Sequence, residues 1–272
     1  VALEIAAAAS LSGLRSLTCM KHVGLNVASD AFMTYLYIGC KGGHIIVSAD
    51  DPGCHSSQNE QDNRYYAIFA GSPMLEPATP QEAKEMTRLG FDISEELKLP
   101  VLLRTTTRLN HIRGPVKIGK FKEPRRKGHF EKNPMLVTTP AVARIRHAEL
   151  LKTLKKAEEL SEKSQFNYLF NIGKPYEWGI VTSGVSFNYV KEIVEDLKLN
   201  VRILKLGMTY PLPRKMCENF IKSCKNIIIV EELEPFLEDQ FKVIAHDIGS
   251  NVKIFGKSTG HFSRLYEYNP DI

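Results

Sequence analysis

Residues 47–64 read Val-Ser-Ala-Asp-Asp-Pro-Gly-Cys-His-Ser-Ser-Gln-Asn-Glu-Gln-Asp-Asn-Arg. The apolar run Ile45-Ile46-Val47 that enters this stretch is typical of a buried strand, and it ends in two carboxylates and a Pro-Gly turn. The polar segment that follows is longer than the roughly two to six residues that a simple connection between elements needs. Because polar loops at the ends of buried strands commonly carry function, the stretch predicts a sheet with a site at this end.

Strand and helix signals alternate on both sides of this stretch. Expected strands are residues 16–20, 45–47, 74–77 and 100–104, and expected helices are residues 1–15, 32–37, 65–69 and 79–98. The last helix has a clear start, because Thr79 can cap it, Pro80 suits its first turn and Glu82 can complete a capping box. Strands alternating with helices predict an α/β fold built from parallel β-α-β units.

A second alternating series begins at Trp178. Its expected strands are residues 179–181, 201–206, 226–230 and 252–255, and its expected helices are residues 185–197, 214–224 and 236–246. Between the two series lie a Gly-, Pro- and Lys/Arg-rich linker and a charged helix at 141–163. We therefore expect two parallel-sheet domains, at residues 1–112 and 166–272, joined by a linker and surface helix at 113–165.

Polar connections are expected to gather at one edge of the first sheet. Residues 21–26, 50–59 and 105–111 each follow a predicted strand and are rich in polar and ionisable side chains. The connections at the opposite edge, 39–43, 71–73 and 97–100, are short and carry little chemistry. Ligands of open parallel sheets bind outside the carboxyl ends of the strands, which places the predicted site there.

Composition narrows the class of protein. The chain has 272 residues, 43% of them hydrophobic, and no apolar run approaches the roughly 18 residues of a membrane span. No secretory signal pattern is present, and residues 1–4 read as the middle of an element, so we expect a piece of a longer chain. The five cysteines form no C-x-x-C pair, which favours reduced thiols in the cytoplasm over a zinc or cluster site.

The net charge of +5 is concentrated in the linker. Residues 113–132 hold eight Lys and Arg against Glu123 and Glu131. Because the basic residues are not interleaved with aromatic side chains on one face, nucleic-acid binding is not expected. The simplest interpretation is a solvated linker, and docking of an acidic partner is the alternative.

His22 and His55 are the candidate catalytic residues, because both lie in connections at the same predicted sheet edge. Asp50-Asp51 could be a metal-binding or coupled carboxylate pair, although an Asx-type turn before Pro52 is the simpler interpretation. Ser56-Ser57 could supply a nucleophile, but the chain contains no Gly-x-Ser-x-Gly elbow.

Two further motifs have simple structural explanations. Residues 182–186, Thr-Ser-Gly-Val-Ser, could hold a phosphate at the start of a helix but also fit an ordinary N-cap. The acidic run Glu231-Glu232-Leu233-Glu234 fits a solvated turn. No P-loop or Gly-x-Gly-x-x-Gly fingerprint occurs.

These motifs together resemble a known family. Residues 20–27, 49–64, 103–108, 206–213 and 231–236 are similar, in order, to segments of the α subunits of indolepyruvate ferredoxin oxidoreductases, which are thiamine-diphosphate-dependent 2-oxoacid:ferredoxin oxidoreductases. The resemblance implies a pyrimidine-binding (Pyr) domain at 1–112 and a transketolase C-terminal-like domain at 166–272. It also implies oxidative decarboxylation of aryl 2-oxoacids to acyl-CoA with reduction of ferredoxin.

The resemblance also implies a site. His22 and His55 would be catalytic, and the residues facing the cofactor or oxoacid would be Lys21, Gly24, Asn26, Ser56, Ser57, Gln58, Asn59 and Arg64. The complete enzyme would need thiamine diphosphate, magnesium and 4Fe-4S clusters, with ligands for the metal and clusters outside this sequence. Its partners would be the remaining α-subunit segments, a β (γ-type) subunit, ferredoxin and coenzyme A. Alternatives are an oxidoreductase for another 2-oxoacid and a non-catalytic assembly module.

Overall fold

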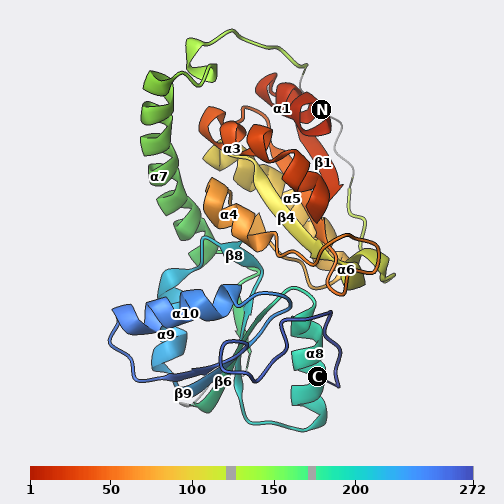
Figure 1. Ribbon diagram of the computed structural model, residues 1–272, viewed down its shortest axis with the longest axis vertical. Coiled ribbons are helices and arrows are strands. Elements are labelled where there is room, and N and C mark those ends of the chain that lie inside the picture. Colours follow the sequence, from red (N-terminus) through yellow and green to blue (C-terminus); the bar gives the residue numbers. More distant parts are fainter. Residues whose placement is uncertain (121–126, 171–175, 272) are drawn as a thin grey trace.

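The computed structural model describes residues 1–120, 127–170 and 176–271, and it forms two α/β domains (Figure 1). Part of the predicted linker, with Glu123, and residues 171–175 lie outside the described residues. Each domain contains a five-stranded sheet. The parallel strands of the first sheet point toward the second domain, so the carboxyl ends of these strands lie near the junction (Figure 1).

The first sheet has the order β1-β2-β4-β3-β8. Its strands are β1 (Ser16–Lys21), β2 (His44–Asp50), β3 (Met74–Leu75), β4 (Val101–Thr106) and β8 (Met208–Tyr210). The first four pair in parallel, as the alternation predicts. Every residue of the central strand β4 is buried, which is typical of a parallel sheet covered on both faces.

Strand β8 was not predicted, because residues 207–213 fall between an expected strand at 201–206 and an expected helix at 214–224. It belongs to the second half of the chain but pairs antiparallel with β3 of the first sheet, Met74 opposite Tyr210 and Leu75 opposite Met208. The backbone N–H of Glu76 also donates to the carbonyl of Gly207 at 2.8 Å. A segment from the second half of the sequence therefore completes the first sheet.

The helices of the first domain are α1 (Ala2–Leu11), α2 (His22–Val27), α3 (Ser29–Ile38), α4 (Arg64–Ala70), α5 (Pro80–Leu97) and α6 (Thr107–His111). The predicted capping of α5 is confirmed, because Thr79 Oγ1 accepts from the Glu82 N–H at 3.2 Å. Glu82 Oε2 in turn accepts from the Ala78 N–H at 2.8 Å, one residue before the cap. Two N–H groups at the start of α5 are thereby satisfied.

Residues 22–27 form a helix, where a loop was predicted. Helix α2 packs against β1 so closely that a Cβ on Gly24 would lie 2.9 Å from Met20 Cβ. Gly24 therefore has a packing role, whereas the resemblance implied a cofactor contact.

The second sheet has the order β10-β9-β6-β7-β5. Its strands are β5 (Tyr168–Phe170), β6 (Tyr176–Ser183), β7 (Arg202–Leu206), β9 (Cys224–Val230) and β10 (Lys253–Phe255), and its helices are α8 (Ser186–Asp196), α9 (Arg214–Lys222) and α10 (Phe236–Asp247). All pairs are parallel except β5 with β7. Strand β5 was not predicted. The α/β fold class is confirmed for both halves of the chain.

The two domains share one apolar core and a long helix. The buried cluster includes Ile45 and Leu102 of the first sheet together with Leu204 and Ile227 of the second. Helix α7 (Pro140–Glu162), preceded by the 3₁₀ turn η1 (Pro134–Leu136), packs on α3 and α5 of the first domain and on α9 of the second. It runs along one side of the first domain (green in Figure 1). Within the described residues, no helix has the length and apolar character that crossing a bilayer requires.

Candidate functional site

Three connections meet where β1, β2 and β4 end, and we call this end of the first sheet the carboxyl edge. The parallel register places Lys21 beside Ala49 and Asp50 beside Thr106. The start of α2, the loop at residues 51–63 and the start of α6 therefore lie together. This arrangement confirms that the three polar connections share one edge.

Asp51 holds the 51–63 loop to its neighbours. Its carboxylate accepts from Ser57 Oγ at 2.7 Å, from the Ser56 N–H at 3.0 Å and from Thr107 Oγ1 at 2.9 Å. The predicted Asx-type turn is wrong, because the turn is closed by the Cys54 N–H donating to the backbone carbonyl of Asp51 at 2.9 Å. Burial opposes ionisation of Asp51, but these hydrogen bonds outweigh it and lower the pKa below its usual range.

Asp51→Asn is expected to destabilise the protein at neutral pH and to change its response to acid. A carboxyl with a lowered folded pKa contributes stability above its unfolded pKa of about 4, and this is lost as pH falls through the folded pKa. Urea unfolding at pH 7, 5, 4 and 3 measures the effect. The gap between wild type and variant should be largest at pH 7 and narrow below pH 4. A gap that is constant with pH would contradict the assignment.

Lys21 is tied to the same loop. Its Nζ donates to the Ser56 carbonyl at 2.5 Å and lies 3.4 Å from Asp51 Oδ2. Its side chain remains 42% exposed, so the ammonium group can still meet a ligand. Ser56 and Gln58 are exposed on this loop.

His22 is buried at the first turn of α2. Its Nε2 lies 2.9 Å from Asn59 Oδ1 and 3.2 Å from the Asn59 carbonyl oxygen. Because both neighbours are acceptors, Nε2 carries the hydrogen and Nδ1 of the neutral ring is an acceptor. His22 Nδ1 is buried and has no hydrogen-bond partner among the described residues. Buried polar atoms are nearly always paired, so this nitrogen is available to a ligand.

A network of side-chain amides fastens the loop to α2. Asn26 and Gln61 exchange two hydrogen bonds at 2.7 and 2.8 Å, and Gln61 Nε2 also donates to Asn63 Oδ1 at 2.5 Å. Tyr66 donates its hydroxyl to Asn26 Oδ1 at 2.8 Å. Asn26 was expected to contact the cofactor, but its amide group forms hydrogen bonds that position the loop. Gln61 and Asn63 were not predicted as site residues, although both lie in the polar stretch at residues 47–64.

Arg104 is a second cation at the carboxyl edge, and it was not predicted from the sequence as a site residue. It is buried, donates from Nε to Asp50 Oδ2 at 2.8 Å and from Nη1 to Glu76 Oε2 at 3.0 Å. Its Nη2, together with Thr105 Oγ1 and Thr106 Oγ1, has no hydrogen-bond partner among the described residues. Burial raises the pKa of Asp50 to about 6, against the opposing effect of the Arg104 cation. The edge thus contains several buried polar atoms that a ligand could satisfy.

Arg64 joins the two domains. It is fully buried, its Nε lies 2.9 Å from Asp62 Oδ1, and its Nη1 donates to Glu231 Oε2 at 2.6 Å. Nη2 donates to the carbonyls of Glu232 at 2.7 Å and Glu234 at 3.0 Å. All three guanidinium nitrogens have partners within the protein. Arg64 therefore does not face a ligand, although the resemblance implied that it would. The acidic run is not a solvated turn, because Glu231 and Glu232 are buried.

His55 lies in a different environment from His22. Its side chain is 52% exposed and its Nε2 is 3.8 Å from Glu267 Oε1, which also accepts from Arg108 Nη2 at 2.7 Å. A cavity of about 310 Å³ is lined by His55, Thr107, Arg108, His111, Ile112 and Glu267. The structure thus places His55 at an open part of the carboxyl edge and His22 at a closed part.

The motif at residues 182–186 does not provide a side-chain cap for α8. Ser183 Oγ lies 3.4 Å from Glu76 Oε2, and Thr209 Oγ1 donates to Glu76 Oε1 at 2.7 Å. These hydroxyls therefore help to fix Glu76, the partner of Arg104. Among the described residues, no group of three or more His, Cys, Asp and Glu side chains is placed to hold a metal ion.

The fold places the chain in a class of two-domain α/β proteins. A solved 2-oxoglutarate:ferredoxin oxidoreductase from Magnetococcus marinus, with 2-oxoglutarate, coenzyme A and succinyl-CoA bound, superposes with a TM-score of 0.71. It is 15% identical and the match covers 99% of this chain and 54% of that one. A split gene transketolase, described as an inactive beta4 tetramer, gives 0.57 at 13% identity over 93% of this chain and 70% of that one. At these identities the likeness concerns the fold.

The sequence relatives are closer. Indolepyruvate oxidoreductase subunits IorA are 47% identical in Methanothermobacter thermautotrophicus, 48% in Pyrococcus abyssi and 42% in Archaeoglobus fulgidus. The matches cover 98–100% of this chain but only 42–44% of each relative, so the chain spans less than half of their length. The resemblance predicted from the motifs is confirmed along the whole chain. No protein-family model matches.

Proposed function

We propose that this chain is part of a cytoplasmic indolepyruvate (arylpyruvate) ferredoxin oxidoreductase. The reaction would convert an aryl 2-oxoacid, coenzyme A and oxidised ferredoxin into an acyl-CoA, carbon dioxide and reduced ferredoxin. The observation that carries the proposal is 42–48% identity to IorA subunits over nearly all of this chain. The buried, unpaired polar atoms of the carboxyl edge support it independently.

The carboxyl edge would receive the organic part of thiamine diphosphate. The buried polar atoms His22 Nδ1, Thr105 Oγ1 and Thr106 Oγ1 support this, because they have no protein partners among the described residues and a polar ligand could supply them. When bound, thiamine diphosphate supplies the carbanion stabilisation that decarboxylation needs. Magnesium, the diphosphate and the 4Fe-4S clusters would be held by the remaining α-subunit segments and by a β (γ-type) subunit, which would pass electrons to ferredoxin.

The residues of this chain would bind, orient and move protons. His22 would hold or transfer a proton at Nδ1, because Asn59 fixes its ring through Nε2 at 2.9 Å. The Lys21 ammonium, held by the Ser56 carbonyl and Asp51, would attract the carboxylate of the oxoacid. His55 would act at the open side of the edge, where the 310 Å³ cavity leaves room for a substrate group. Ser57, Gln58 and Asn59 would complete the loop wall.

The test uses the intact protein with the chains that purify with it. Reduction of methyl viologen is followed with indolepyruvate, phenylpyruvate and 2-oxoglutarate, each with and without coenzyme A and thiamine diphosphate. Indolepyruvate is expected to give the highest kcat/KM, and omission of thiamine diphosphate from depleted protein should abolish the signal. Failure of every 2-oxoacid to reduce the dye would reject the enzyme function.

Two alternatives have specific support. The similarity in fold to a 2-oxoglutarate:ferredoxin oxidoreductase favours an enzyme for another 2-oxoacid, which a higher kcat/KM for 2-oxoglutarate would support. The similarity in fold to an inactive transketolase tetramer favours a non-catalytic assembly module. Calorimetric titration with thiamine diphosphate separates that alternative, because a module without a cofactor site would release no binding heat.

A further inference from the structure

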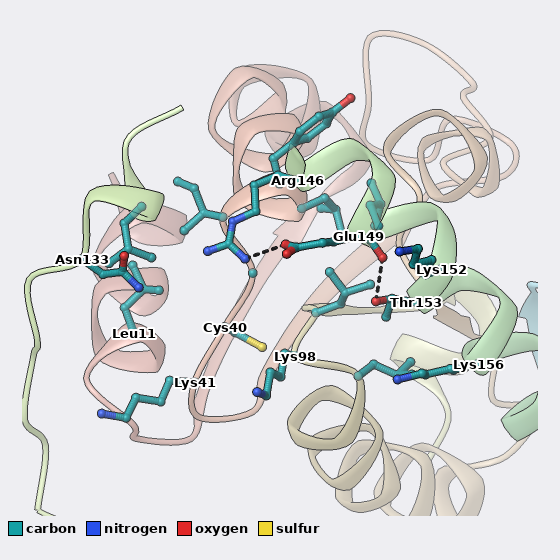
Figure 2. A pocket seen from close by; sticks show the side chains of 18 of the residues that line it. Leu11, Cys40, Lys41, Lys98, Asn133, Arg146, Glu149, Lys152, Thr153 and Lys156 are labelled. Atoms are coloured by element: carbon teal, nitrogen blue, oxygen red, sulfur yellow. Dashed lines mark hydrogen bonds and ion pairs between the residues drawn. The ribbon is translucent and has the colours of Figure 1, made fainter. Parts of the chain in front are cut away.

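A second cavity lies at the opposite edge of the first sheet, below helix α7. It has a volume of about 590 Å³, and its walls come from the end of α3, the connections 39–41 and 97–99, the turn η1 and α7 (Figure 2). We call it the α7 cavity. These connections precede β2 and β4, whose six or seven residues span roughly 20 Å to the carboxyl edge. The α7 cavity is therefore separate from the site described above.

The α7 cavity has an excess of positive charge. Its charged lining residues are Lys41, Lys98, Arg146, Lys152, Lys156, Glu131 and Glu149. Both carboxylates are already used, because Lys41 lies 3.2 Å from Glu131 and Arg146 lies 2.9 Å from Glu149. The other three lining cations, all lysines, have no carboxylate partner within the part of the chain that the structure describes.

The three unpaired ammonium groups come from two sides. Figure 2 shows Lys152 and Lys156 along α7, with Lys98 and Cys40 across from them. Lys152 and Lys156 are four residues apart on the same helical face, so their like charges repel. Lys98, Lys152 and Lys156 are exposed, unlike Arg64 and Arg104, which are buried and pair with Asp62 and Asp50. An anion in the cavity would relieve the repulsion.

The uncharged lining of the α7 cavity includes six leucine side chains. They are Leu11, Leu36, Leu97, Leu99, Leu136 and Leu150. Four of them, at positions 36, 97, 99 and 150, are also buried members of the core. The volume lies within the roughly 300–1,000 Å³ typical of small-molecule sites and far exceeds what an inorganic ion fills. Apolar walls beside unpaired cations suit a molecule with both an apolar body and a negative charge.

We propose that the α7 cavity binds a small organic anion. Its carboxylate or phosphate group lies between Lys98, Lys152 and Lys156, and its apolar body packs on the leucines. Helix α7 contacts both domains. A ligand that binds only the folded state stabilises the protein. The proposal does not depend on the oxidoreductase function.

Binding is measured by isothermal titration calorimetry on the intact protein, in the complex with which it purifies. The probes are phenylacetate, phenyl phosphate and inorganic phosphate, and the two organic arms distinguish a carboxylate site from a phosphate site. At least one organic anion should bind saturably, more tightly than inorganic phosphate by about ten-fold or more, with an affinity that falls as salt rises. Equal binding of inorganic phosphate, or no saturable binding of either organic anion, would overturn the proposal.

Variants locate the binding site. The double substitution Lys152→Gln and Lys156→Gln should weaken binding by about ten-fold or more, because two of the three cations are lost. Lys155→Gln is the matched control, since Lys155 is exposed on the same helix but does not line the cavity, and it should change affinity by less than about two-fold. Thermal midpoints of the unliganded variants verify folding. Wild-type affinity in the double variant would assign the heat to another site and reject the proposal.

Discussion

Arg64→Met is expected to lower the free energy of unfolding by about 3–5 kcal/mol, because it leaves buried carboxylates without their cation. Asp62 and Glu231 both pair with the Arg64 guanidinium, at 2.5 and 2.6 Å, and the side chains of all three residues are at most 1% exposed. The carbonyls of Glu232 and Glu234 lose a donor as well. Methionine fills similar space but satisfies none of these groups.

Urea unfolding at pH 7 measures this loss. Arg108→Met is the matched control, since Arg108 also bridges to the C-terminal half, at 2.7 Å from Glu267, but its side chain is half-exposed. Exposed ion pairs contribute about 1 kcal/mol or less, so the control should lose far less stability. Adding Glu231→Gln to Arg64→Met should restore part of the loss, because it removes one uncompensated charge. Equal losses in the two single variants would refute the buried-charge explanation.

The Arg64 network explains how the junction is held over the carboxyl edge. Arg64 begins α4 directly after the 51–63 loop, and its partners Glu231 and Glu232 follow β9 of the second domain. Arg104 and Glu76 form a second connection between the two halves of the chain, because Glu76 also accepts a hydrogen bond from Thr209. Disturbing the junction should therefore also displace the loop that carries Asn59, the partner of His22.

The fold was largely predictable because its signals are local. Apolar runs and periodicity indicated the central strands, and residues 79–82 indicated the start of α5. The short elements were not predicted, because each depends on a specific tertiary contact and carries little periodic signal of its own. Strand β8 has three residues and is defined by pairing with β3, more than 130 positions earlier in the chain. Helix α2 has six residues, and it depends on the close contact that Gly24 allows with Met20.

The position of the candidate site's connections was predictable, but the contacts of several of its residues were not. The polar connections identified the carboxyl edge because strand order in a parallel sheet determines where loops meet. The role of Arg64 could not be read from the sequence, because Glu231 lies 167 residues away. The burial of the acidic run at residues 231–234 depends on the same ion pair between Arg64 and Glu231. Arg104 was not predicted, because it lies in a buried strand and its charge is compensated by Asp50 and Glu76, which belong to two other segments of the chain.

His22→Ala is expected to lower kcat for 2-oxoacid-dependent dye reduction by about 10²–10⁴-fold, the usual range for loss of a proton-transfer group. His22 is the histidine with a buried, unpaired Nδ1 among the described residues, and Asn59 fixes its ring from the other side. Removing it would take away the proposed proton carrier and one anchor of the loop. Steady-state kinetics of the intact protein give kcat and KM separately.

Two controls separate proton transfer from simple loss of structure in His22→Ala. His55→Ala removes a half-exposed histidine from the same edge and should reduce kcat by only a few-fold. Added imidazole should restore part of the activity of His22→Ala, and this variant should lack one ionisation in its pH–rate profile. A purely structural role would lower the thermal midpoint without either kinetic signature. Activity of His22→Ala within a few-fold of wild type would remove His22 from the mechanism and shift the proton-transfer role toward His55.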